Sequence, residues 1–144
     1  MKINKFILPL TFCLFLLFSS WICDNGGDSI KGRYNTFWLD TYLDRSLCYS
    51  NTDGEIGGRI KVDAFINRIG FDNRYIIAER IYFKAFQMPG PDYDSITYYI
   101  IDTEFESEFG NKDVLGPFEL DEFKEKKREH GIEDLNFTEE YRDW

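Results

Sequence analysis

Residues 71–102 read FDNRYIIAERIYFKAFQMPGPDYDSITYYIID, and this stretch decides the fold. Two apolar runs, Tyr75–Phe86 and Ile96–Asp102, flank a cluster of chain-breaking residues at 88–92. β-branched and aromatic residues crowd both runs, and such side chains fit a pleated, half-buried surface. The stretch therefore predicts two adjacent antiparallel strands. Three consecutive apolar residues, 76–78, indicate burial on both faces and so a central place in the sheet.

Shorter patterned segments lie on both sides of this pair. Tyr34–Leu43 alternates as a strand with two partly apolar faces, Ser46–Ser50 predicts a second short strand, and Arg59–Phe71 predicts one bent strand or two short ones. Leu120–His130 has acids in its first turn, bases near its end and Gly131 just past it, which is typical of a helix. We therefore expect an α+β fold: an antiparallel β-meander of about five strands with a C-terminal helix packed on the sheet.

Two segments are predicted to lie outside the strands. Gly116–Phe118 breaks the apolar pattern before the helix, and Thr138 is placed to cap a last short turn at Glu139–Arg142. Two alternatives are open for the C-terminus: Leu135, Phe137, Tyr141 and Trp144 fold back on the sheet, or the terminus is loose.

The first residues resemble a bacterial lipoprotein signal. Met1–Lys5 carries two lysines, and Phe6–Phe18 is apolar apart from Thr11 and has the length of a signal-peptide core. The small pair Ser19-Ser20 follows, and then Trp21-Ile22 precede Cys23. In proteins with such a signal the cysteine is acylated and becomes the new first residue. Ile22 departs from the pattern, which has Gly, Ala or Ser at that position.

This resemblance implies three parts: a signal peptide at 1–22, a flexible tether at 23–33 and a single globular domain at 34–144. It implies a protein anchored to a membrane of the cell envelope through lipid, such as palmitate, on Cys23. One alternative is an ordinary secretory signal cut near Ser20, which leaves Cys23 free to form a disulfide with Cys48 in a secreted or periplasmic protein. The other is an uncleaved anchor.

The charge balance is strongly acidic. Lys and Arg total 17 against 26 for Asp and Glu among 144 residues, a net charge of -9, and no acid precedes Cys23. Such a surface repels phosphate backbones, so we expect no binding of nucleic acid. The same acidic surface favours a basic partner.

Few residues point to catalysis. The only candidates for a carboxylate-dependent hydrolase are Asp102 and Glu104, and alternating acids are more typical of a solvated strand end. A metal site or a His-based catalytic pair would need His130, the single histidine, which lies at a predicted helix end where a charge favours the dipole. The three cysteines match no zinc pattern. We expect no catalytic residue, metal or cofactor.

The sequence therefore favours a non-enzymatic, envelope-anchored binding module for a protein or a small ligand. Its expected partner-binding residues are the acids after the second predicted strand and one nearby aromatic: Tyr93, Asp102, Glu104, Glu106 and Glu108. A specific version is an immunity or inhibitor protein that caps a basic toxin by charge complementarity. A structural subunit of a larger envelope complex is the other alternative.

Three short motifs resemble those of a known family. They are RYIIA at Arg74–Ala78, YYIIDT at Tyr98–Thr103, and GPF at Gly116–Phe118 followed by a charged helix that ends near Gly-Ile. The match covers about Asn67 to Ile132 and is similar to a family of small uncharacterised bacterial lipoproteins, classed as a domain of unknown function. Glu119 departs from that family, which has Ser or Thr as a helix cap. The resemblance implies an exported location and a shared fold, and it brings no activity.

Overall fold

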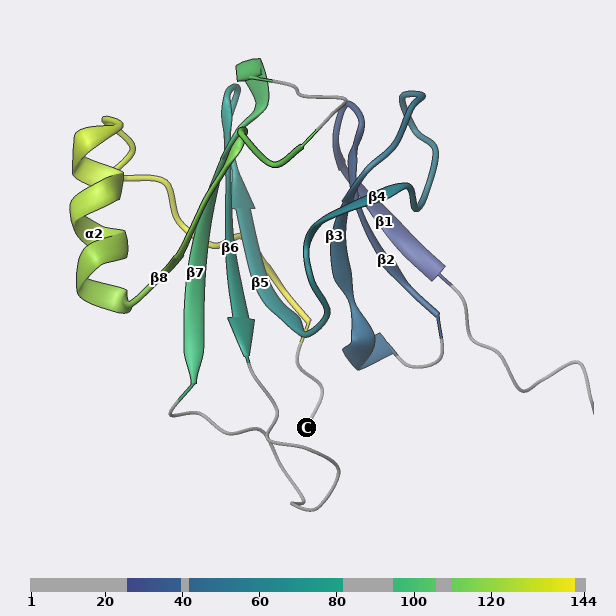
Figure 1. The fold of residues 1–144 in the computed structure, drawn as a ribbon, viewed down its shortest axis with the longest axis horizontal. Helices are drawn as coiled ribbons and strands as arrows, with labels where there is room; N and C mark the ends of the chain where they lie inside the picture. The colour runs from purple at the N-terminus through teal and green to yellow at the C-terminus, as the bar shows by residue number, and fades with distance from the viewer. Residues whose placement is uncertain (1–25, 40–41, 82–94, 106–109, 142–144) are drawn as a thin grey trace, which may run out of the picture.

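The computed structural model describes residues 26–39, 42–81, 95–105 and 110–141. Within these ranges the strands form two antiparallel sheets (Figure 1). Sheet A has the order β1-β2-β3-β4, formed by Gly26–Lys31, Tyr34–Trp38, Ser46–Tyr49 and Arg59–Val62. Sheet B has the order β8-β7-β6-β5-β9, formed by Val114–Phe118, Ile96–Asp102, Tyr75–Ile81, Ile66–Phe71 and Glu139–Glu140. Both sheets are meanders, and β9 joins the free edge of β5.

The strand pair predicted from residues 71–102 forms the middle of sheet B. β6 and β7 run antiparallel in unbroken register, from Tyr75 opposite Asp102 to Ile81 opposite Ile96. β6 has neighbours on both sides, so the predicted pairing and the central position are confirmed. Residues 82–86 of the first predicted run lie outside the described residues.

Sheet B is the middle of three layers. Sheet A covers one of its faces and helix α2, Leu120–Glu129, covers the other (Figure 1). Successive side chains of a strand point to opposite faces, so Ile76 and Ala78 join the core with sheet A while Tyr75 and Ile77 join the core under the helix. Because both faces of β6 contact a core, apolar residues follow one another along this strand instead of alternating with polar ones.

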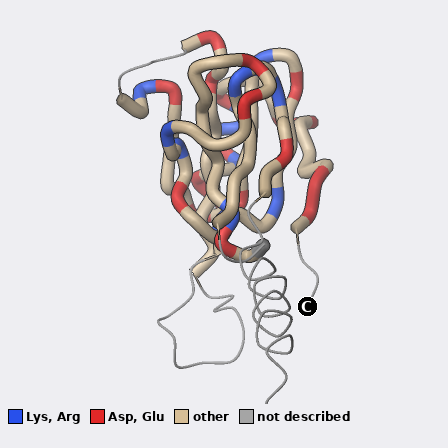
Figure 2. Tube along the Cα trace, turned by 90° about the vertical axis from the view of Figure 1, so that its right-hand side faces the viewer, with Lys and Arg blue, Asp and Glu red and all other residues tan. Residues whose placement is uncertain are grey.

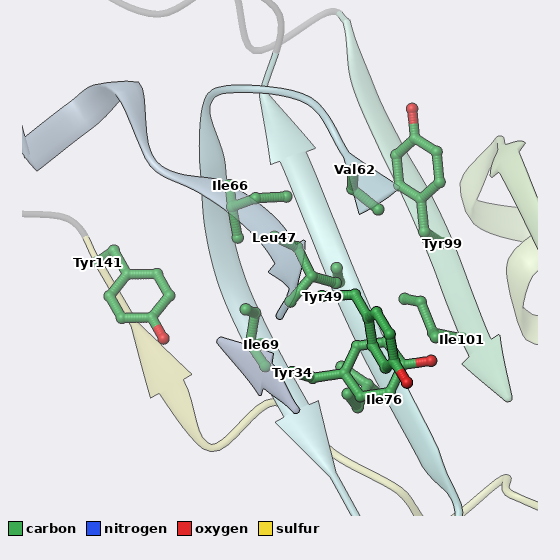
Figure 3. Close-up of a cluster of buried hydrophobic side chains, with 11 residues drawn as sticks. Tyr34, Leu47, Tyr49, Val62, Ile66, Ile69, Ile76, Tyr99, Ile101 and Tyr141 are labelled. Carbon is green, nitrogen blue, oxygen red and sulfur yellow. The ribbon is translucent and has the colours of Figure 1, made fainter. Parts of the chain in front are cut away.

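The larger core lies between the two sheets (Figure 3). Leu47 and Val62 from sheet A meet Ile69 and Ile101 from sheet B, and all four are almost fully buried. Four aromatic rings also belong to this layer: Tyr34, Tyr49, Tyr99 and Tyr141. Tyr34 and Tyr49 meet edge to face with ring centroids 5.1 Å apart, a preferred geometry for aromatic pairs.

Helix α2 matches the predicted segment Leu120–His130 to within one residue. Glu119 precedes it and makes no side-chain capping hydrogen bond, whereas Gly131 ends it with φ +67°, a left-handed conformation that glycine adopts readily. Phe123 is the one buried residue of the helix and stacks on Tyr98 of β7 at 4.8 Å. The helix therefore docks mainly through one apolar side chain near its N-terminal end, since Phe123 also stacks on Phe137 with ring centroids 6.2 Å apart. No helix within the described ranges has the length and apolar character needed to cross a membrane.

The α+β class, with antiparallel strands and a C-terminal helix, is confirmed. The strands, however, divide between two sheets and exceed the five expected. Gly26–Lys31, predicted as part of a flexible tether at 23–33, pairs with β2 instead. Pairing uses backbone groups and needs no apolar period, so the Gly-rich composition concealed this edge strand. The strand predicted at Tyr34–Leu43 ends at Trp38, and Tyr42–Asp44 forms a short 3₁₀ helix, η2.

Two segments expected outside the sheets belong to them. Gly116–Phe118 forms the end of β8, paired with β7. Glu139–Glu140 forms β9, paired with Arg68 and Ile69 of β5, where a helical turn was predicted. Tyr141 then folds back into the core, as the first of the two alternatives for the C-terminus predicts, and Trp144 lies outside the described residues. In both places hydrogen bonds to a neighbouring strand override a weak local preference.

Candidate functional site

The acidic segment after β7 begins with an ion pair that belongs to the fold. Arg74 grips the Asp102 carboxylate with two parallel hydrogen bonds, Nε to Oδ1 at 3.0 Å and a terminal nitrogen to Oδ2 at 2.6 Å. Asp102 is buried, and it also accepts the backbone N–H of Glu104 at 3.1 Å. The hydrogen bonds from Arg74 lower the pKa of Asp102 below its usual value of 3.8, against the effect of burial.

Among the predicted partner-binding residues that the structure describes, only one has a charged side chain exposed to solvent. Glu104, in the 3₁₀ helix η3 at Thr103–Phe105, lies in solvent with Oε2 3.1 Å from the same Arg74. The structure thus brings Asp102 and Glu104 together, but Asp102 faces the fold and offers no contact surface. Tyr93, Glu106 and Glu108 lie outside the described residues.

The Asp102 ion pair predicts an acid-dependent loss of stability. A carboxylate whose pKa is lowered by folding contributes stability that is fully present above the unfolded pKa, near 3.8, and is lost as the pH falls toward the folded value. Asp102→Asn should therefore be less stable than the natural protein at neutral pH, and the difference should shrink below about pH 4. Urea unfolding at a series of pH values measures this. A difference that stays constant down to acid pH would contradict the assignment.

A second acid of this segment, Asp113, is buried between the sheets. Its Oδ1 lies 2.8 Å from Lys61 Nζ, and Tyr34 donates its hydroxyl to Oδ2 at 2.9 Å. Lys61 also donates to the carbonyl oxygen of Gly110 at 3.0 Å. These bonds join sheet A to the connection between β7 and β8, so this acid has a structural role as well.

The single histidine makes a modest aromatic contact. His130 Nδ1 lies 3.5 Å from the Tyr75 hydroxyl, and the two rings are 5.6 Å apart. No group of three His, Cys, Asp or Glu side chains in the described part of the chain is arranged to hold a metal ion.

A concave surface lies on the outer face of sheet A. Leu47 and Tyr49 of β3 point into the core, so Cys48 between them points outward and helps to floor a groove of about 510 Å³. Apolar residues from β2 and the residue after it, β3, the β3–β4 loop and β4 dominate its lining: Phe37, Trp38, Leu39, Cys48, Ile56 and Ile60. Burial raises the pKa of the Cys48 thiol to about 11, so this cysteine behaves as a small apolar group.

The loop between β3 and β4 that carries Ile56 is fixed in place. Gly57 donates its N–H to Asn35 Oδ1 at 2.7 Å and accepts Asn35 Nδ2 at 3.1 Å through its carbonyl oxygen. Gly58 has φ +112°, and a Cβ there would overlap the Tyr49 carbonyl oxygen, so only glycine fits. The groove wall is therefore preformed by buried hydrogen bonds.

The start of the described chain lies against this groove. Gly26 of β1 pairs with Trp38 of β2, and a Cβ on Gly26 would overlap the Trp38 ring. A Cβ on Gly27 would overlap Ile56 in the same way. Successive strand residues point to opposite faces, so Gly27 lets Ile56 of the groove wall close over β1, whereas Gly26 makes room for the Trp38 ring on the face toward sheet B. The entry of the chain therefore lies at the edge of sheet A, beside the groove.

Sequence reasoning missed the groove, although one signal pointed to it. Phe37 and Leu39 fall on one side of an alternating strand whose other side is also apolar, and a strand with two apolar faces needs a cover on each. Sheet B covers one face of sheet A, whereas the β3–β4 loop covers only part of the other face and leaves the groove open. Ile56, in an aperiodic loop, carried no such signal.

Comparisons with known proteins place the chain in a family without assigning it an activity. No curated protein and no solved structure matches it. A family model described as "Protein of unknown function (DUF3997)" matches residues 31–141, from the end of β1 to the last described residue. The match spans both sheets and the helix, and the chain therefore belongs to the DUF3997 family of proteins of unknown function.

Proposed function

We propose that this protein is a non-enzymatic lipoprotein of the bacterial cell envelope, anchored to a membrane through Cys23, whose folded domain serves as a binding module. The observation that carries the proposal is the segment that resembles a lipoprotein signal and ends at Cys23, close to the first described strand. β1 starts at Gly26, three residues after the cysteine that ends the signal-like segment. Even fully extended, three residues span only about 11 Å, so acylation of Cys23 would hold the domain directly against the bilayer.

The buried charges support a binding module over a hydrolase. Asp102 and Asp113 are each held by a cation and by further hydrogen bonds. A general acid needs a raised pKa, and Arg74 shifts the pKa of Asp102 in the opposite direction. These acids stabilise the fold, while the exposed surface of sheet A and the acidic net charge are available to bind.

Cys23→Ala is expected to release the protein from the membrane. Several acyl chains, each contributing about 0.8 kcal/mol per buried methylene, anchor a protein stably, and the variant has no thiol to carry them. Intact mass of the purified mature protein should show a chain that begins at Cys23 with added acyl mass. The variant should lack that mass and leave the membrane fraction.

Cys48→Ala is the matched control, because Cys48 is buried and is no candidate for acylation. This variant should keep both the acyl mass and the membrane location. An untrimmed, unmodified chain in the soluble interior of the cell would overturn the proposal. A mature mass that shows a Cys23–Cys48 disulfide would favour plain secretion instead.

A further inference from the structure

The rim of the groove on sheet A gathers the exposed apolar side chains of this layer. Leu39, Ile56 and Ile60 are 55%, 40% and 52% exposed, and they come from the end of β2, the β3–β4 loop and β4. Single exposed apolar residues are common, whereas three around one groove form a contiguous patch of the kind that marks an interaction site. We propose that this rim is a membrane-contact face, through which the lipid-anchored domain lies on the bilayer surface.

The position of the chain entry favours lipid as the occupant. Gly27 lies directly beneath Ile56, and Gly26 pairs with Trp38, the residue before Leu39, so an anchor at Cys23 would emerge beside the rim. Because the anchor would lie within about 11 Å of the domain, the rim would stay close to the bilayer surface. The rim could leave the surface only if the whole domain rotated about the point where the chain enters it. Once the anchor is inserted, contact of the rim is an intramolecular event at high effective concentration.

The charge of the rim also favours lipid. β2 and β3, the two inner strands of sheet A, carry no charged residue. Figure 2 views the molecule from the side of sheet A and shows uncharged stretches of chain between the charged residues. Among the described residues that line the groove, Asp44 is the only charged one. An apolar face with its charges at the margin suits the boundary between headgroups and acyl chains, where such faces bury by about 5–10 Å. A second copy of so acidic a chain is disfavoured by mutual repulsion.

The contact predicts an orientation. Helix α2 forms the layer farthest from sheet A, so it would point away from the membrane (Figure 1). Leu120, at the start of this helix, is 46% exposed and apolar, which makes it a matched control for the rim residues.

A fluorophore at the rim tests the proposal on the acylated protein. In Ile60→Cys the new thiol is exposed, whereas Cys48 is buried with a pKa raised to about 11 and Cys23 is expected to be acylated, so an NBD reagent should label residue 60. In phosphatidylcholine vesicles the NBD emission should shift to the blue, and doxyl-labelled lipids should quench most of it. The same label in Leu120→Cys should show neither change. Adding Leu39→Asn and Ile56→Asn to the first variant should weaken the quenching, while Leu120→Asn should not.

The outcomes separate this inference from the proposed function on which it rests. Intact mass of the same sample reports acylation. Without acyl mass the lipoprotein proposal fails and the membrane contact fails with it. With acyl mass but equal NBD signals at residues 60 and 120, only the membrane contact is overturned. A third outcome is a blue shift at residue 60 that depends on the density of protein on the vesicles and that doxyl lipids do not quench. This outcome would mean that a second copy covers the rim, and it would also overturn the membrane contact.

Discussion

Asp113→Ala should lower the free energy of unfolding by about 3–5 kcal/mol, the usual cost of breaking a buried ion pair from one side. The side chains of Asp113 and Lys61 are both fully buried in the natural protein. Removing the carboxylate leaves a buried ammonium without its counter-charge and takes the acceptor from the Tyr34 hydroxyl. Urea unfolding followed by fluorescence measures the change.

Two further variants separate the pair from a simple loss of charge. Lys61→Met combined with Asp113→Leu removes both charges together, and it should lose less stability than Asp113→Ala alone, because no uncompensated charge stays buried. Asp63→Ala removes an acid that is 71% exposed and lies 3.8 Å from Arg80, and it should change stability by at most about 1 kcal/mol. If the double variant were as unstable as the single one, packing rather than charge would explain the effect.

The central layer of this fold was predictable because its pattern is local. β6 and β7 lie in one hairpin, and their apolar residues are those that a strand covered on both faces requires. The helix was predictable for a similar reason, since its charge order and Gly131 act within one element. The edge strands β1 and β9 were not, because Gly26-Gly27 and Glu139-Glu140 supply only backbone groups to a neighbour.

The candidate site also has a part that the sequence could predict and a part that it could not. The acids near residue 102 were visible in the sequence, but their roles depend on partners from distant segments. The register that sets Tyr75 opposite Asp102 also brings Arg74 within reach of that carboxylate. Lys61 reaches Asp113 only because sheet A packs on sheet B. A sequence shows where charges occur, and tertiary packing decides which of them remain on the surface.

A buried arginine, Arg45, contacts both the first strand and the C-terminal end of the described chain. Its substitution should lower the free energy of unfolding nearly as much as that of Asp113. Arg45, just after η2, is 1% exposed; it forms an ion pair with Asp28 of β1 and donates to Thr36 Oγ1 of β2 at 2.6 Å. Its guanidinium carbon lies 4.1 Å from the centre of the Trp38 ring and 3.8 Å from that of Tyr141. One side chain therefore connects the first strand, the groove residue Trp38 and the end of the family-matched region.

Arg45→Leu should cost about 3 kcal/mol, because it removes two desolvated cation–π contacts and a charged hydrogen bond. The cost should stay below that of Asp113→Ala, since the side chain of Asp28 is 56% exposed and regains water when its partner is lost. Arg45→Lys is the discriminating control. Lysine keeps the charge but lacks the planar group that stacks on both rings, so it should recover only a minor part of the loss. Full recovery by lysine in urea unfolding would show that Arg45 acts through charge alone, and the aromatic contacts would then contribute little to holding β1 and the C-terminal end in place.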